Sequence, residues 1–242
     1  MIQSYLAAVN TLLAEVEKSE QDRMRQAAEK VAAAIEQDGV VHLFGCGHSH
    51  ILTEEVYYRA GGLVPINPIL HEPLMLHEGA VKSSELERKN DYAHVFMNDV
   101  DIREGDVMVA ISTSGRNPVP VDAAHIAKSK GAFVIGITSR EYSSSQPSRH
   151  TSGEHLYDAV DLVIDNHAPV GDALLSHEAV AVNFSPSSTV IGAAILNAIF
   201  AESIKQMAEN GFEPPIFLSG NMEGADEHNR ELIEKYRGRV KL

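Results

Sequence analysis

The sequence predicts an α/β fold, a three-layer sandwich in which helices cover both faces of an open, doubly wound parallel sheet. Short apolar runs alternate along the chain with stretches of helical periodicity. The runs are almost continuously apolar, as in Val107-Met108-Val109-Ala110-Ile111, which is typical of parallel strands covered on both faces. The expected strands are 40–44, 63–67, 106–111, 132–138 and 160–165.

A long N-terminal helix is expected before the first strand. Apolar residues recur at spacings of mostly three and four from Ile2 to Val16, and a second apolar stretch runs from Met24 to Ile35. Because no strand precedes this helix, we expect it to pack on a later element or on a second subunit. Gly39 separates the helix from the first strand.

The remaining elements follow from the same patterns. Helices are expected at 49–60, 83–90, 119–130 and 187–210, and a charged helix at 225–236. The serine-rich segment 139–154 is expected to be a surface loop or mobile flap. We predict one domain over 1–242, with 1–36 as a helical segment and 220–242 as a C-terminal tail helix.

Composition limits the function. The net charge of −14 opposes binding to nucleic acid or to anionic membranes. The single cysteine, Cys46, excludes disulfide frameworks and cysteine-based zinc modules. There is no basic stretch before an apolar core near Met1, and no apolar run approaches the roughly 20 residues of a membrane span. We therefore predict a cytoplasmic protein with neither nucleic-acid nor membrane partners.

Two loops follow predicted strands, Gly45–His50 and Ser112–Asn117. In open parallel sheets, ligands bind beyond the carboxyl ends of the strands. The second loop places three hydroxyls and a glycine before a helix, where N–H groups and the helix dipole favour an anion without a lysine. It is therefore a candidate phosphate site within an acidic protein. The alternative is a hydroxyl-rich turn that only caps the helix.

The first loop departs from a dinucleotide-binding fingerprint. His50 stands where the third glycine belongs, and the position near Asn67 lacks the acidic residue that would bind a ribose. The chain also lacks a P-loop sequence and a Gly-x-Ser-x-Gly elbow. We accordingly predict no cofactor.

Taken together, the two loops resemble those of the SIS (sugar isomerase) domain. Ser187-Ser188-Thr189, before a long helix, is similar to the third hydroxyl cluster of that family. The resemblance covers roughly residues 30–210 and is best to small single-domain members. It implies a five-stranded, flavodoxin-like parallel sheet, a phosphosugar ligand, and a homodimer or homotetramer with sites at subunit interfaces.

The resemblance also implies roles for particular residues. The phosphate would be held by Ser112, Thr113, Ser114 and Asn117, while Ser49 and Ser188 would contact phosphate or sugar. His48 is expected to bond ligand hydroxyls. The full set of predicted binding residues is Gly47, His48, Ser49, Ser112, Thr113, Ser114, Gly115, Asn117 and Ser188.

Aldose–ketose isomerisation is the reaction that we predict, and it needs a base at the sugar carbon and a donor at the carbonyl oxygen. Two His-Glu pairs follow the second strand, in 70–73 and 76–79, and we favour His77 or Glu78 as the acid/base. Glu55, on the helix after the first loop, is a further candidate. The resemblance suggests that His177 approaches a neighbour's site. The alternative for these residues is a solvated loop.

Other hypotheses remain open at this stage. His48, His50 and Glu54 or Glu55 could supply three zinc ligands, and some SIS isomerases use zinc. Alternating residues in a tight turn usually diverge, so no metal is predicted. The alternatives to an isomerase are a phosphosugar sensor that acts on a protein partner and a lyase or etherase that removes a sugar substituent.

Overall fold

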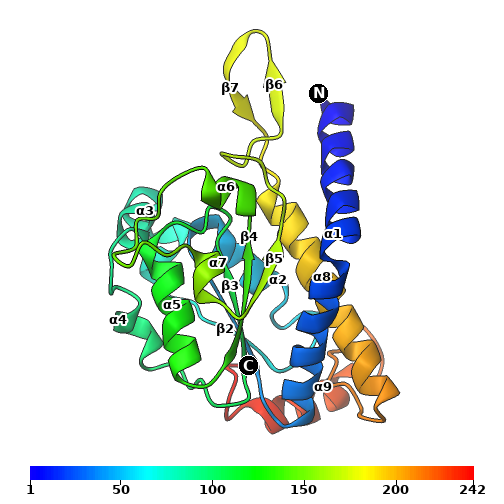
Figure 1. The fold of residues 1–242 in the computed structure, drawn as a ribbon. Helices are drawn as coiled ribbons and strands as arrows, with labels where there is room; N and C mark the ends of the chain where they lie inside the picture. The colour runs from blue at the N-terminus through cyan, green and yellow to red at the C-terminus, as the bar shows by residue number, and fades with distance from the viewer.

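The computed structural model describes residues 1–242 and has the predicted architecture (Figure 1). A five-stranded sheet has the order β2-β1-β3-β4-β5, and all its strand pairs are parallel. The order reverses between β1 and β3, as in doubly wound folds. The strands are β1 Val41–Gly45, β2 Ile66–Pro68, β3 Val107–Ile111, β4 Phe133–Thr138 and β5 Leu162–Asp165.

One face of the sheet is covered by α1 (Ile2–Glu36), α2 (Ile51–Glu55) and α8 (Ser188–Glu209). The first helix is continuous, and the later element on which it packs is α8. By length and composition alone, α8 is apolar enough to cross a membrane. A core helix passes the same test, and α8 packs on α1 and α2 in the larger hydrophobic cluster.

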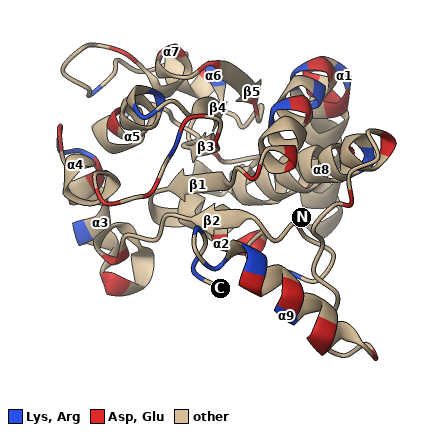
Figure 2. Cartoon of the chain, turned by 90° about the horizontal axis from the view of Figure 1, so that it is seen from below, with Lys and Arg blue, Asp and Glu red and all other residues tan.

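The other face is covered by α3 (Ala80–Glu87), α4 (His94–Met97), α5 (Pro118–Ser129) and α7 (Leu156–Ala159). Their buried residues pack on the side chains that the strands send to this face, such as Phe44 and Met108. Seen from below, the sheet lies between this layer and the α1–α8 layer (Figure 2). The three-layer prediction is therefore confirmed.

A projecting hairpin is absent from the predicted element list. It consists of the antiparallel strands β6 (Leu175–His177) and β7 (Val180–Phe184) and stands clear of the body beyond α8 (Figure 1). At its base, the Tyr5 hydroxyl of α1 donates to the Pro186 carbonyl at 2.9 Å. Most of β7 is exposed, so the hairpin lacks the buried face on which sequence patterns depend.

Segment 139–154 also differs from a plain loop. It begins with a short helix, α6 (Arg140–Ser144), which is capped by the Ser139 hydroxyl. Farther on, His150 Nε2 lies 2.9 Å from Asp122 Oδ1 of α5. His125 of the same helix lies 3.1 Å from Glu154 Oε2. These contacts fix the segment along α5, which its polar composition does not reveal.

The C-terminal tail forms the predicted helix, α9 (Ala225–Tyr236), and then returns to the sheet. Arg239 Nη2 donates to Asp106 Oδ2 at 2.6 Å, and His42 Nε2 lies 3.2 Å from the same oxygen. Burial raises the pKa of Asp106, but bonds from His42 and from the Val40 and Arg103 N–H groups outweigh burial and hold the pKa below its usual range. The tail is thus held by a buried ionic network.

Candidate functional site

The two predicted loops begin at the ends of neighbouring strands, at the same level of the sheet. Gly45 ends β1 and is the register partner of Ile111, which ends β3. The strand order reverses between these strands, which is where open α/β sheets bind ligands. The residues that follow, Cys46 and Ser112, therefore begin two adjacent loops. The structure thus brings together most of the residues predicted from the first and second motifs.

The loop Ser112–Asn117, hereafter the hydroxyl loop, requires glycine at position 115. Gly115 has φ +58°, and a Cβ there would lie 2.7 Å from both Ser143 Oγ and Thr138 Oγ1. Its N–H donates to the Ser112 hydroxyl at 3.3 Å, which folds the loop on itself. Ser112 and Gly115 are buried, whereas Thr113 and Ser114 are only half-buried. The hydroxyls open to a ligand are accordingly those of Thr113 and Ser114.

Asn117 joins the hydroxyl loop to α5. It is the N-cap residue of this 12-residue helix, and proline follows in the first turn. Its Oδ1 accepts a 2.8 Å bond from Arg149 Nη1, and its side chain lowers the pKa of Glu87. The amide oxygen of Asn117 is therefore engaged within the chain, so this residue helps to order the loop where we predicted a phosphate contact.

Glu87, at the end of α3, is a candidate that the sequence prediction missed. Its half-buried carboxyl interacts with Asn117 of the hydroxyl loop, which lowers the pKa of Glu87, and acts electrostatically on Cys46 of the first loop. Burial raises the pKa of Glu87, while Asn117 and the charges of Arg88 and Arg149 oppose the rise. Nothing in the local sequence distinguishes Glu87 from its neighbour Glu85, because only the packing of α3 turns one of them inward.

The first loop is a short 3₁₀ helix, η1 (Gly47–His50), that folds back on the strand end. A Cβ on Gly45 would lie 2.6 Å from the Ser49 backbone, and Gly47 has φ +56°. Ser49 is half-buried and His48 is exposed, so both remain accessible. Cys46 is buried, and burial, followed by the charge of Glu87, raises the pKa of its thiol well above the usual value.

His77 and Glu78 lie beside the first loop on another 3₁₀ turn, η3 (Leu76–Glu78). The His77 ring centroid is 6.5 Å from that of His50, and both His77 and Glu78 are exposed. The earlier histidine of the pair motif, His71, instead stacks on Phe96 at 4.5 Å. Burial lowers the pKa of His71. Of the two His-Glu pairs, the second thus stands nearer the loops.

The other catalytic candidates lie elsewhere in the chain. Glu55 of α2 forms a 2.8 Å ion pair with Arg59. His177 is at the end of β6 on the projecting hairpin. The hairpin formed by β6 and β7 projects from the body of the chain (Figure 1).

The zinc-ligand hypothesis can be compared with the geometry of the first loop. His50 Nδ1 lies 2.6 Å from the Gly47 carbonyl oxygen, and its Nε2 is 3.9 Å from Glu54 Oε1. His48 is exposed, and Glu55 is paired with Arg59. No group of three or more His, Cys, Asp or Glu side chains is arranged to hold a metal ion.

The third hydroxyl cluster is bonded to an acidic residue of its own chain. Asp172 Oδ2 accepts a 2.6 Å bond from the Ser188 hydroxyl. Its Oδ1 accepts from the Ser187 hydroxyl and from the N–H groups of Ser187 and Ser188, at 2.8–2.9 Å. The start of α8 is thus capped by a carboxylate. The Ser188 hydroxyl, which we predicted to contact a ligand, already donates its hydrogen to Asp172.

The sheet and its paired loops define an α/β protein with a candidate ligand site at the topological switch point. The sequence profile of the SIS domain matches residues 4–139, more than half of the chain. The chain belongs to the SIS domain family, which confirms the resemblance found in the two motifs.

The chain is similar to proteins found by sequence and by structure. It is 64% identical to the UPF0309 protein BH0227 of Halalkalibacterium halodurans, over all of this chain and 97% of the relative. Phosphoheptose isomerase GmhA of Neisseria gonorrhoeae superposes with a TM-score of 0.53 at 19% identity, over 86% of this chain and 97% of that one. The Vibrio vulnificus NanR protein, complexed with ManNAc-6P, superposes with a TM-score of 0.50 at 14% identity, over 100% and 70%. Both structures share the fold.

Proposed function

We propose that this protein binds a phosphosugar through the hydroxyl loop and catalyses aldose–ketose isomerisation. The observation that carries the proposal is the register of Gly45 with Ile111, which starts the two loops side by side. Backbone N–H groups, the hydroxyls of Thr113 and Ser114 and the N-terminus of α5 supply neutral donors for a phosphate. Because these donors form a local site, the chain can bind an anionic ligand although its net charge is −14.

The reaction would need a base to remove the proton at C2 and a donor to stabilise the enediolate oxygen. His77 and Glu78 are our first candidates because they stand beside the first loop. Glu87 is a further candidate, because a carboxyl whose pKa is raised by burial is better matched to proton abstraction near neutral pH. The bound phosphate would supply binding energy remote from the reacting carbons.

The two solved structures that share the fold support this proposal. One is a phosphoheptose isomerase, and another is complexed with the phosphosugar ManNAc-6P. We propose a cytoplasmic location and neither a metal nor a cofactor for this chain.

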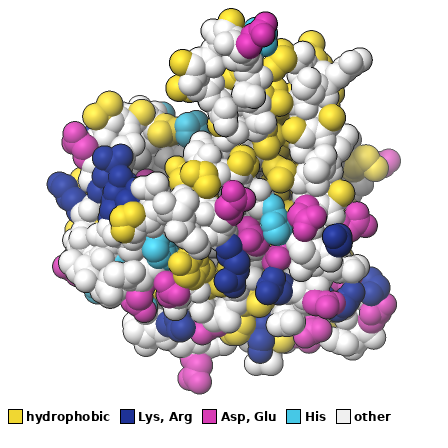
Figure 3. Space-filling model, turned by 45° about the horizontal axis from the view of Figure 1, so that its top comes forward, with side chains coloured by type: hydrophobic (Ala, Val, Ile, Leu, Met, Phe, Trp, Pro, Cys, Tyr) yellow, Lys and Arg dark blue, Asp and Glu magenta, His cyan; other side chains and the backbone are white.

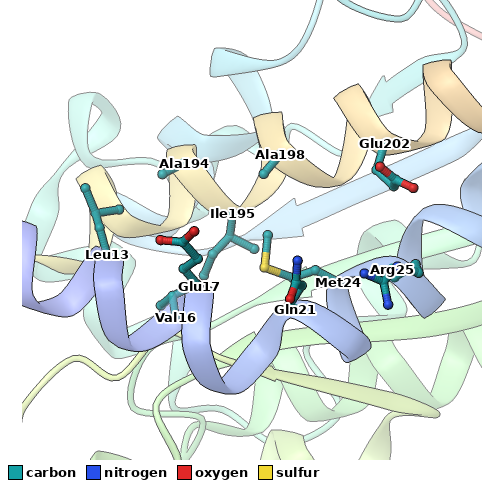
Figure 4. A pocket seen from close by; sticks show the side chains of 10 residues that line it. All are labelled: Leu13, Val16, Glu17, Gln21, Met24, Arg25, Ala194, Ile195, Ala198 and Glu202. Carbon is teal, nitrogen blue, oxygen red and sulfur yellow. The ribbon is translucent and has the colours of Figure 1, made fainter.

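We further propose a homodimer or homotetramer that completes the site. A cavity of about 290 Å³ lies between α1 and α8 and is lined largely by apolar side chains, among them Leu13, Met24 and Ala198 (Figure 4). Such a groove suits a helix of a second copy. The exposed hairpin would then bring His177 to the site of the neighbouring subunit. Ser188 would approach a ligand only if Asp172 moved away.

Titration calorimetry with a panel of aldose and ketose phosphates tests binding. Ser114→Ala should weaken phosphosugar binding by about 1–3 kcal/mol, because a phosphate oxygen loses a donor. Ser219→Ala, on the segment before α9, is the matched control and should bind as the wild type does. Equal affinities for Ser114→Ala and the wild type across the panel would disprove the phosphate site.

Deuterium incorporation from solvent at C2 of the bound sugar tests catalysis. An isomerase exchanges this proton, whereas a sensor that acts on a protein partner leaves it unlabelled. Product analysis with phosphorylated N-acetylmuramate separates an isomerase from a lyase or etherase, because only elimination releases the ether substituent.

A further inference from the structure

Three arginines lie on or beside the hydroxyl loop, and none of them forms an ion pair within 4.0 Å. Arg88 ends α3, Arg116 belongs to the hydroxyl loop, and Arg149 lies in the segment after α6. The chain has 34 acidic and 20 basic side chains, so an arginine has many potential partners. Every ion pair within 4.0 Å nevertheless involves other basic residues.

Hydrogen bonds hold these three residues, here called the arginine cluster, near one another. The N–H of Arg149 donates to the carbonyl of Arg116 at 2.8 Å, and Arg149 Nη1 donates to Asn117 Oδ1. Asn90, two residues after Arg88, accepts from the Thr151 N–H at 2.8 Å and lies 3.5 Å from the Arg149 carbonyl. The end of α3 is therefore fastened to the segment that carries Arg149.

The positive charges of the cluster repel one another. Burial, followed by the charges of Arg116 and Arg88, lowers the pKa of Arg149. The negative charge of Glu87 opposes this effect and raises the pKa of Arg149. Three positive charges thus face one negative charge. Lys and Arg side chains gather in a dark-blue group on the side of the molecule where α3 lies (Figure 3).

Most N–H donors of these guanidinium groups form no hydrogen bond within the chain. Arg116 uses its Nε on the Pro147 carbonyl at 3.1 Å, and Arg149 uses Nη1 on Asn117. Each guanidinium carries five N–H donors in a planar fork that matches phosphate and carboxylate oxygens. Arg88 and Arg149 are exposed and Arg116 is half-buried, so the remaining donors face solvent.

We propose that the arginine cluster is a second anion subsite. It would bind a further phosphate or carboxylate group of a phosphosugar whose first phosphate lies in the hydroxyl loop. This inference rests on the proposed function and narrows its substrate class to sugar bisphosphates or phosphorylated sugar acids. Because Arg116 belongs to the hydroxyl loop itself, one ligand can occupy both subsites. A second anion would also relieve the repulsion among the arginines.

Calorimetry with two ligand pairs tests the subsite. The pairs are fructose 6-phosphate with fructose 1,6-bisphosphate, and glucose 6-phosphate with 6-phosphogluconate. The wild type should bind the doubly anionic member of at least one pair about tenfold more tightly than its monophosphate partner. A preference for the bisphosphate indicates a phosphate subsite, and a preference for 6-phosphogluconate indicates a carboxylate subsite. Arg88→Gln should lose this advantage and keep its affinity for the monophosphate within about twofold.

Arg230→Gln is the matched control, because Arg230 is exposed on α9, remote from the two loops. It should retain the full preference for the doubly anionic ligand. Equal affinities for both members of both pairs in the wild type would overturn the subsite and leave the phosphosugar proposal intact. A preference that survives in Arg88→Gln, or a parallel loss of both ligands by this variant with an unchanged melting temperature, would also overturn it. Failure of all four ligands to bind the wild type would refute both proposals.

Discussion

The hydroxyl of Ser188 donates to Asp172 Oδ2 at 2.6 Å, and through this contact a residue outside α8 caps the start of that helix. The other oxygen of the same carboxylate accepts two N–H groups and the hydroxyl of Ser187. A carboxylate satisfies orphan N–H donors and interacts favourably with the helix dipole. Asp172 thus ties the connection after β5 to the core helix.

Replacing this carboxylate should destabilise the fold. Asp172→Ala removes a charged N-terminal cap, so we expect the free energy of unfolding to fall by about 1–2 kcal/mol in urea titrations. Asp99→Ala is the control, since Asp99 is exposed and belongs to none of the ion pairs described above. If both variants unfold at the same urea concentration as the wild type, the cap contributes nothing.

The conformation of the hydroxyl loop requires glycine at position 115. Gly115→Ala combines a left-handed backbone with a Cβ 2.7 Å from two side-chain oxygens. Gly153→Ala is a matched control with φ +81° and open space around the added Cβ. Both variants should lose about 1 kcal/mol through backbone strain, and Gly115→Ala should lose about 1–3 kcal/mol more. Thermal unfolding compares them, and equal losses would mean that the loop adapts.

Local patterns account for the sheet and for both loops. Most strands of the sheet lie in apolar runs, although β2 is the short segment Ile66-Asn67-Pro68, and the motif residues lie next to a strand end. The features missed by sequence reasoning depend on distant segments. Glu87 turns inward because α3 packs beside the hydroxyl loop, and Asp172 meets Ser188 across 16 positions. The hairpin is exposed, so no buried face marks β7 in the sequence.

The buried network at Asp106 predicts a pH dependence of stability. Because the folded-state pKa of Asp106 lies below its usual range, its contribution is complete above the unfolded pKa of about 3.9 and is lost as the pH falls through the folded value. Asp106→Asn should lose about 3–5 kcal/mol at neutral pH, because His42 and Arg239 lose a buried partner. Its unfolding free energy should also fall less steeply than that of the wild type below about pH 4.

Asp101→Asn is the control, because it compares the loss of an exposed ion pair with the loss of the buried one at Asp106. Asp101 is exposed and pairs with Arg103 and Arg239, so its loss should cost at most about 1 kcal/mol. Urea titrations at several pH values provide the measurement. Parallel pH profiles for Asp106→Asn and the wild type would contradict the assignment of the low pKa to Asp106.

Subunit mixing tests whether the hairpin serves a neighbouring site. In the proposed oligomer, Ser114→Ala damages the hydroxyl loop of its own chain, whereas His177→Ala removes the residue that its hairpin would deliver to the partner. Each variant alone should isomerise its substrate slowly. A mixed dimer would contain one site built from an intact loop and an intact hairpin, so random mixing should restore about a quarter of the wild-type rate. Mixing Ser114→Ala with Gly115→Ala provides the control, because both changes damage the same loop and no intact site can form. If the Ser114→Ala and His177→Ala mixture stays as slow as its components while mass spectrometry shows mixed oligomers, the hairpin does not complete a neighbour's site.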